Sequence, residues 1–379
     1  MIDYFKYRKS LQEILFYTSI AIYYVYFFIS RSTVHIDGLK ILLLFSVFLA
    51  FLATFVNSFG YTKRGLIIQV ILYTCMAISV INNRRLDILQ LVMIILVSLN
   101  SINMDFKYLL KFNFWCLLTM YSIITLSAIL GIINTEILTH SGLDQTVNTY
   151  GFTYYNIPSL SIFTILILYV VLKDKINFID IFLYLVVSFW AYKVYTQRLL
   201  FILLLFYIFM YLLFRYKDIS SNIFFSAISY FLPLVMTVIS FTLAYIYKVN
   251  ASSLYTLDNL LNGRIGLTLQ AFNLYKITIW GQPFTWTTGD EIKFIGNYFF
   301  LDNAYAYALL AYGLIFLLGL IIEYTSILIF LQKNSELKLY LWIVVVVIGG
   351  TIVFDWLLNI IFSPCLYLII RIINKKNVL

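Results

Sequence analysis

Residues 199–214 read LLFILLLFYIFMYLLF, a run without a single charged side chain. About 20 such residues make a helix long enough to cross the hydrocarbon core of a bilayer. The same composition extends along the chain: 63% of its 379 residues are hydrophobic and 11% are charged, against about 25% charged residues in a soluble domain. We therefore expect an all-α polytopic membrane protein, with residues 1–379 forming a single integral membrane domain.

Apolar runs separated by short polar turns predict about twelve transmembrane helices. We place them near residues 11–30, 38–57, 65–82, 86–104, 113–133, 158–173, 177–195, 199–214, 223–247, 303–331, 338–355 and 357–372. The first run follows Lys6, Arg8 and Lys9 and is too long for the apolar region of a signal peptide. We expect it to be retained as the first membrane helix.

Basic residues predict the orientation of these helices. With the N-terminus in the cytoplasm, every inner connection is short and carries two or more Lys or Arg residues within it or at its edge. The outer connections spread theirs over far more chain, so both termini are expected in the cytoplasm. Arg84 and Arg85 are the exception, because they fall in a very short outer turn. Either the predicted helix boundary is misplaced there, or the pair has a function on the outer face.

The net charge of +9 is accounted for by this topology, and we expect no nucleic-acid partner. Two outer loops are long, 134–157 and 248–302, and the second is the large loop between the ninth and tenth helices. Long loops in a compact protein are usually functional or disordered, and these contain aromatic residues and glycines with few charges. We therefore expect any chemistry on the outer face. No cluster has metal-ligand spacing, and no metal or cofactor is expected.

The turn Tyr195-Thr196-Gln197-Arg198 lies where the seventh expected helix meets the eighth. One interpretation is an arginine that snorkels to lipid headgroups. The other is a guanidinium at the membrane boundary that grips a phosphate, since its planar fork donates two parallel hydrogen bonds. Both interpretations remain open from the sequence.

The second outer loop contains Leu261-Asn262-Gly263-Arg264-Ile265-Gly266. The two glycines allow close approach of the backbone to a ligand. Residues 267–275 favour a short helix, so Arg264 is expected at a helix N-terminus, where free N–H groups also attract an anion. The alternative is an ordinary loop arginine.

Other polar residues in the outer loops have weaker signals. Asp302 and Asn303 open the tenth expected helix, and either one is a candidate N-cap. Asn156 is expected as a cap near the sixth helix, with Pro158 in its first turn. The candidates for a general base, should one be needed, are Asp302, Asp290, Glu291 and His140.

Several short motifs occur here in one order along the chain. They are Gly151-Phe152 through Asn156, Thr196-Gln197-Arg198, Leu261-Asn262-Gly263-Arg264, Trp280-Gly281, and Asp302-Asn303-Ala304-Tyr305 with Gly313. This order resembles the Wzy-type polysaccharide polymerases and the related O-antigen ligases. The resemblance covers roughly 150–315 in motif and the whole chain in topology. A departure is the absence of histidine from the large second loop, which disfavours a ligase with a loop histidine as base.

The resemblance implies a glycosyltransferase that joins oligosaccharide repeat units carried on undecaprenyl diphosphate, at the outer face of the bacterial cytoplasmic (inner) membrane. The expected partners are these lipid-linked glycans and membrane lipid, with a flippase and a chain-length regulator as further partners. We expect Arg198, Arg264 and Asp302 to be catalytic, because arginines stabilise the charge that develops as a lipid diphosphate leaves. The residues expected to bind substrate are Gly151, Asn156, Arg84, Arg85, Tyr305 and Trp280.

The sequence leaves rival classes open. A lipid-linked oligosaccharide flippase or another transporter suits the helix count, but it should place charged groups within the spans. Here the spans are nearly free of them, with Glu323 the main exception. An O-antigen or teichoic-type ligase, an acyltransferase that uses His35 or His140, and a non-catalytic scaffold are further alternatives. Capsule, O-antigen and exopolysaccharide all remain open as products.

Overall fold

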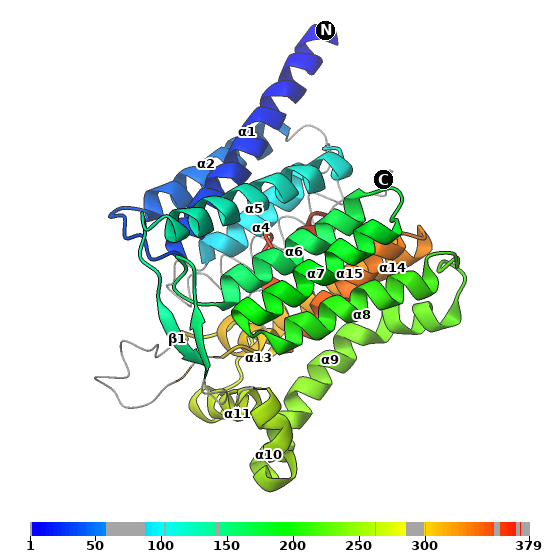
Figure 1. Ribbon diagram of the computed structural model, residues 1–379. Coiled ribbons are helices and arrows are strands. Elements are labelled where there is room, and N and C mark those ends of the chain that lie inside the picture. Colours follow the sequence, from blue (N-terminus) through cyan, green and yellow to red (C-terminus); the bar gives the residue numbers. More distant parts are fainter. Residues whose placement is uncertain are drawn as a thin grey trace. The chain divides into compact units, whose positions relative to one another are not determined.

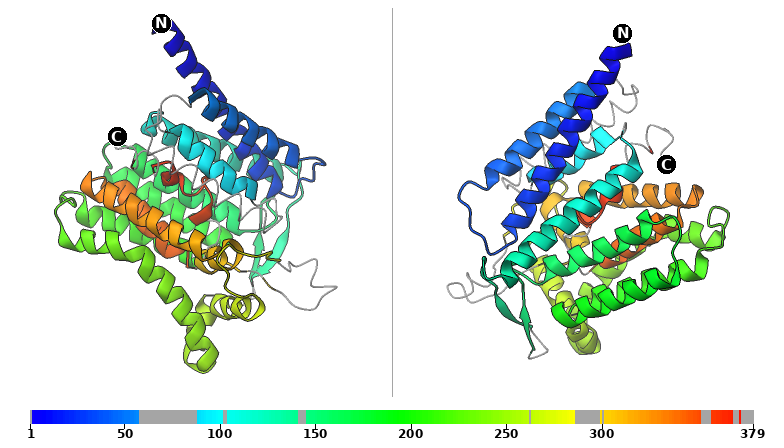
Figure 2. Two further views of the ribbon diagram at one scale, coloured as in Figure 1. Left: turned by 180° about the vertical axis from the view of Figure 1, so that it is seen from behind. Right: turned by 45° about the horizontal axis from the view of Figure 1, so that its top comes forward.

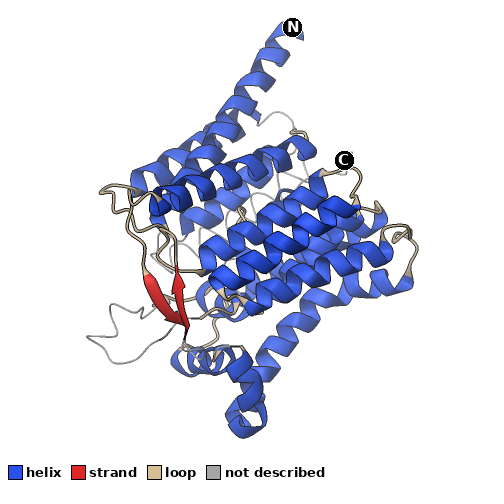
Figure 3. Ribbon diagram, in the orientation of Figure 1, coloured by secondary structure: helices blue, strands red, loops and turns tan. Residues whose placement is uncertain are grey.

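The computed structural model of the protein describes residues 2–57, 88–101, 104–140, 145–261, 263–285, 299, 301–351, 357–368 and 372. Among these residues, five helices are long and apolar enough to cross a membrane: α1 (Ile2–Ser30), α5 (Phe106–Ile129), α7 (Phe178–Tyr195), α9 (Ile223–Val249) and α14 (Leu314–Lys333). Further apolar helices are shorter, and the described part is mostly helical (Figure 3). The chain is therefore a predominantly α-helical membrane protein. Twelve spans remain a prediction, and the helix expected near 65–82 lies outside the described residues.

The chain divides into two compact units. The first contains α1, α2 (Lys40–Asn57), most of α4 (Ile88–Asn100), α5, α6 (Asn156–Leu172), α7, α8 (Arg198–Phe214) and the 3-10 turn η3 (Pro364–Tyr367). The first two helices lie side by side and antiparallel (Figures 1 and 2). Their buried Ser19 and Ser46 hydroxyls each donate to the other residue's carbonyl, at 2.8 and 2.9 Å. Small polar residues of this kind let membrane helices approach closely.

Helices α5, α6, α7 and α8 follow one another and each packs on the next. The fifth begins before residue 113, where the sequence placed its start, because the Asp105 carboxylate caps it by accepting from the Tyr108 N–H at 3.0 Å. At the other end of this helix the chain forms a hairpin of β1 (Ile137–His140) and β2 (Gln145–Asn148), red in Figure 3. The all-α prediction did not include this hairpin, which lies within the first expected outer loop.

The described part of the second unit lies within residues 217–359. It contains α9, α10 (Ala251–Leu260), α11 (Arg264–Leu274), α13 (Ala304–Tyr307), the π-helical turn η2 (Ala308–Tyr312), α14 and α15 (Leu337–Gly349). Helix α9 leads directly into α10 and α11 at its C-terminal end (Figure 1). The short helix expected from residues 267–275, with Arg264 at its N-terminus, is thus confirmed as α11, whereas α10 was not foreseen in the loop 248–302.

Two expected helices are corrected. The helix predicted over 303–331 breaks at Gly313, which has φ +95°, and α14 begins only after it. The N–H groups of Leu314 and Ile315 bond to loop carbonyls instead of helical ones, so the break is stabilised by tertiary contacts. The helix predicted over 357–372 is not continuous either: turns lead into η3 at Pro364, which has no N–H to continue a helix.

Candidate functional site

The stretch before α6 is fixed to the loop that follows α1. Gly151 has φ +87°, and a Cβ there would lie 2.7 Å from Ile133 Cδ1. Its carbonyl accepts from the Thr33 N–H at 2.9 Å, while the fully buried Phe152 stacks on Tyr121. Only glycine fits this backbone and this space. The packing favours a role for Gly151 in holding the loop in place.

Asn156 links two of the sequence motifs. It is the first residue of α6, and its side-chain oxygen accepts from the Gln197 amide at 2.8 Å. The sequence expected it as a helix cap, but Tyr155 occupies the N-cap position without a side-chain hydrogen bond. Pro158 does lie in the first turn, as expected. Asn156 is therefore positioned by the chain segment immediately before Arg198.

The turn between α7 and α8 has an unusual backbone. Thr196 has φ +54°, and its buried hydroxyl has no hydrogen-bond partner among the described residues. Tyr150, whose ring contacts Tyr195, also has a positive φ, +47°. A left-handed conformation costs a residue other than glycine about 1–2 kcal/mol, and such strain clusters at functional sites. Two such residues thus lie at one end of the first unit.

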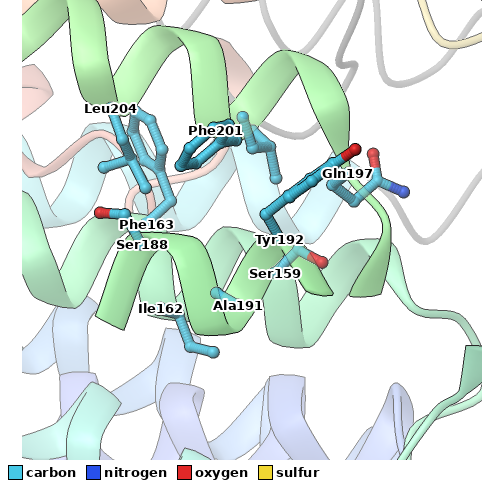
Figure 4. A pocket seen from close by; sticks show the side chains of 10 residues that line it. Ser159, Ile162, Phe163, Ser188, Ala191, Tyr192, Gln197, Phe201 and Leu204 are labelled. Atoms are coloured by element: carbon cyan, nitrogen blue, oxygen red, sulfur yellow. The ribbon is translucent and has the colours of Figure 1, made fainter. Parts of the chain in front are cut away.

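Arg198 is exposed at the first position of α8, and no described carboxylate forms an ion pair with it. A small hollow, with room for about one water molecule, lies between α6, α7 and α8 (Figure 4). Its walls are mostly apolar, with Tyr192 and Phe201 stacked 5.0 Å apart and Gln197, the residue before Arg198 in the chain, at one edge. An exposed guanidinium at the start of an apolar helix suits a ligand that has both an apolar portion and an anionic group.

In the second unit, Arg264 begins α11, as the sequence predicted. Gly263 precedes it with φ +77°. The Nε atom of Arg264 lies 2.9 Å from Oδ2 of Asp302, and the two side chains are only 12% and 16% exposed. Two of the expected catalytic residues are therefore brought together from distant positions in the loop 248–302.

The N-terminus of α11 is not open to an external anion, which corrects the sequence expectation. The carboxylate of Asp258, in α10, accepts from the N–H groups of Ile265 and Gly266 at 2.8 and 3.2 Å. The carbonyl of Asp258 accepts from the Gly263 N–H at 2.8 Å. Sequence analysis missed this acid, although its position a few residues before a Gly-Arg helix start was an available signal.

Asn303, and not Asp302, caps α13. Its side-chain oxygen accepts from the N–H groups of Tyr305 and Ala306, each at 3.1 Å, and its amide nitrogen donates to the Ser240 hydroxyl. Tyr305 is buried and donates its hydroxyl to the Val347 carbonyl at 2.8 Å. The Tyr305 hydroxyl is thus occupied by a hydrogen bond inside the second unit. Asp302 does not cap the helix, and its carboxylate pairs with Arg264 instead.

The Trp280-Gly281 turn packs against the break before α14. Gly281 has φ +87°, and a Cβ there would lie 2.2 Å from the Ala311 carbonyl oxygen. A Cβ at Gly313 would likewise lie 2.4 Å from the Ile279 carbonyl oxygen and 2.4 Å from the Gly281 nitrogen. The Trp280 side chain is 36% exposed. Two glycines that are distant in sequence therefore form one crossing, with a partly exposed tryptophan beside it.

Several sequence candidates lie outside the described residues. These are Arg84, Arg85, Asp290 and Glu291, and the side chain of His140 is likewise not described. Arg198 belongs to the first unit and Arg264 to the second. We predict from the sequence that both arginines face one common outer cavity. Within the described part, no group of three His, Cys, Asp or Glu side chains could hold a metal ion.

Comparison with known proteins assigns this chain to no family. No protein-family model, no curated protein and no solved structure matches it. The two arginine-bearing turns are therefore the basis for inferring what the protein does.

Proposed function

We propose that this membrane protein is a polymerase of Wzy type. It transfers a growing glycan from undecaprenyl diphosphate to a sugar hydroxyl of the next lipid-linked repeat unit, at the outer face of the bacterial cytoplasmic membrane. The hydroxyl oxygen bonds to the anomeric carbon and loses its proton. The bond between the anomeric carbon and the diphosphate oxygen breaks, and the lipid diphosphate leaves with the electron pair. This bond supplies the free energy of transfer.

The observation that carries the proposal is the environment of Arg198. An exposed guanidinium with no ion pair to a described residue stands at a strained turn, at the start of the apolar helix α8. A lipid diphosphate combines these two requirements, since it has an apolar chain and a doubly anionic head. Charge-assisted hydrogen bonds from arginine to phosphate strengthen as the leaving group gains charge.

The Arg264–Asp302 pair supports the same chemistry in the second unit. A guanidinium has five N–H donors, and the ion pair with Asp302 uses the Nε donor. The terminal N–H groups can bind phosphate while Asp302 fixes the plane of the guanidinium. Asp302 thereby acts as the orienting group for Arg264 and is also a candidate to accept the proton of the attacking hydroxyl.

A second candidate function has one specific observation in its favour. Polar side chains are buried within apolar helices of the first unit: Gln12 is 3% exposed, and Asn100 and Asn113 are 0% exposed. Polar groups inside a membrane often mark a transport pathway. A lipid-linked oligosaccharide flippase is therefore the alternative that an experiment must separate from a polymerase.

Glycan length separates the two functions. We expect Arg198→Ala and Arg264→Ala, at matched expression, to remove the ladder of long chains on a gel and leave single repeat units on the lipid at the outer face. Loss of one charge-assisted contact costs about 1.5–3 kcal/mol, roughly ten- to hundredfold in rate. A flippase defect would trap the units at the inner face. Normal ladders in both variants would remove these arginines as the site.

The outer location of the second loop is tested by labelling intact cells. Ser252 is exposed in α10, and Lys175 is exposed in the short connection between α6 and α7. A membrane-impermeant thiol reagent should modify Ser252→Cys on intact cells and Lys175→Cys only after permeabilisation, with the parent protein as the unlabelled control. The reverse pattern would contradict the topology, with both termini in the cytoplasm, on which the proposal depends.

A further inference from the structure

Asp258 is a buried acid whose hydrogen bonds all fix one short piece of backbone. Its side chain is 6% exposed, although α10 around it is largely exposed. Its carboxylate accepts from the N–H groups of Ile265 and Gly266, and its carbonyl accepts from the Gly263 N–H. These three residues flank Arg264 on both sides. The conformation around this arginine is therefore set by one residue of the preceding helix.

The Asp258 carboxylate lies so close to Gly266 that little space remains for a side chain at position 266. A Cβ at position 266 would lie 3.3 Å from Oδ2 of Asp258 and 3.6 Å from the Tyr247 ring. The Tyr247 ring, near the end of α9, thus lies against the same position at the start of α11 as the Asp258 carboxylate. Gly266 permits this contact, and Gly263 provides the left-handed residue that the turn requires.

The side chain of Arg264 depends on this placement. Its single ion pair within the described residues joins Nε to Asp302, which lies in a segment far along the chain. A small rotation of the first turn of α11 would move the guanidinium away from that carboxylate. An ordinary helix cap serves to satisfy one or two backbone N–H groups. The turn that Asp258 caps also carries the arginine that we propose to bind phosphate.

We propose that Asp258 is a positioning residue for the transfer reaction: it fixes the first turn of α11 so that Arg264 meets Asp302 and the diphosphate of the lipid-linked donor. The role of Arg264 in this statement rests on the proposed polymerase function. The positioning itself does not, and it can be measured without a glycan assay.

The first measurement is the labelling rate of position 264. In the full-length protein in membranes, Arg264→Cys reacts with an impermeant thiosulfonate, and we compare this rate with and without Asp258→Ala. We expect Asp258→Ala to speed labelling by about tenfold or more, because hydrogen bonds to a charged group hold the partly buried turn. Asp258→Asn keeps the acceptor oxygen for both N–H groups and should restore a rate near that of the parent.

Asn250→Ala is the matched control. Asn250 caps the neighbouring helix α10 by accepting from the Ser253 N–H, without touching the turn at Arg264. Its loss should leave the labelling of position 264 unchanged. The second measurement is glycan length in variants that retain Arg264: Asp258→Ala should shorten the ladder, and Asp258→Asn and Asn250→Ala should preserve it.

The outcomes separate this inference from the polymerase proposal. Unchanged labelling in Asp258→Ala, or equal ladder loss in Asn250→Ala, would overturn the positioning role, since the effect would then be absent or a general loss of stability. Faster labelling with normal ladders in both Asp258→Ala and Arg264→Ala would refute the role of Arg264 in polymerisation. If Asp258→Ala does not accumulate in cells, Asp258→Asn provides the test. A full-length ladder together with parental labelling in Asp258→Asn supports the inference. A lost ladder together with parental labelling overturns it.

Discussion

Arg198 and Arg264 each begin a helix close after a residue with positive φ, yet their surroundings differ. At the start of α8 that residue is Thr196, and Arg198 is exposed with no ion pair to a described carboxylate. At the start of α11 it is Gly263, and Arg264 is largely buried against Asp302. The first turn retains backbone strain and a charge with no described counter-ion, whereas the second has a glycine at the positive φ and a carboxylate beside its arginine.

This difference predicts which substitution weakens only ligand binding and which also lowers the stability of the folded protein. An exposed, unpaired arginine contributes little to the folded state, so its removal should be felt mainly by an anionic ligand. A paired arginine with low exposure contributes to both, because its loss leaves a carboxylate that is partly removed from water. The same substitution should therefore have different consequences at the two turns.

The largest expected effect is on thermal stability at the second turn. Arg264→Ala removes the ion pair of the Asp302 carboxylate, which is 16% exposed, and loss of one member of a buried pair costs up to about 3–5 kcal/mol. The double variant Arg264→Ala with Asp302→Ala should recover part of this loss. Arg198→Ala should change stability by less than about 0.5 kcal/mol. Melting temperatures in one detergent measure all three, and equal shifts for the two arginines would contradict the comparison.

Replacing each arginine by lysine should reduce transfer activity less than replacing it by alanine, and the reduction should differ between the two turns. Arg198→Lys keeps the charge but loses the fork, so it should recover part of the transfer activity lost in Arg198→Ala. Arg264→Lys should recover less, since a single ammonium group must serve both Asp302 and the phosphate. Ladder length at matched expression reads out both variants. Full recovery at position 264 would show that the Nε contact with Asp302 does not matter for activity.

The smallest expected effect concerns acid pH at the end of the second unit remote from Arg264. Asp218 accepts from the Ser335 hydroxyl and from the N–H and hydroxyl of Ser220, and these bonds lower the pKa of its carboxyl below the ordinary value. A lowered pKa gives stability that is present at neutral pH and is lost as pH falls below about 4, when the carboxylate protonates.

Asp218→Asn should therefore lower the melting temperature slightly at pH 6, and the difference from the parent should shrink as the pH approaches 3. Ser335→Ala should act in the same direction by removing one of these hydrogen bonds. A difference that grew on acidification would contradict the assignment of the lowered pKa to Asp218.

Helical membrane architecture was predictable from the sequence because bilayer crossing requires long apolar runs, and composition alone reveals those. The runs near 177–195, 199–214 and 223–247 correspond closely to α7, α8 and α9. Arg264 at a helix start was predictable too, from a Gly-Arg pair before an apolar segment. The break at Gly313 was not, because an apolar run tolerates one glycine and only the crossing with Gly281 shows that the helix stops there.

The pairs that define the candidate site needed the tertiary structure. Asn156 with Gln197 and Arg264 with Asp302 each join residues whose spacing in sequence gives no geometric signal, and Asp258 meets the start of α11 because α10 packs against that helix. The sequence by itself determined a membrane-embedded helical chain, since the hydrophobic effect acts on each segment separately. Only the tertiary structure decided which polar groups meet, because hydrogen bonds and ion pairs form within about 3 Å and depend on how whole helices pack.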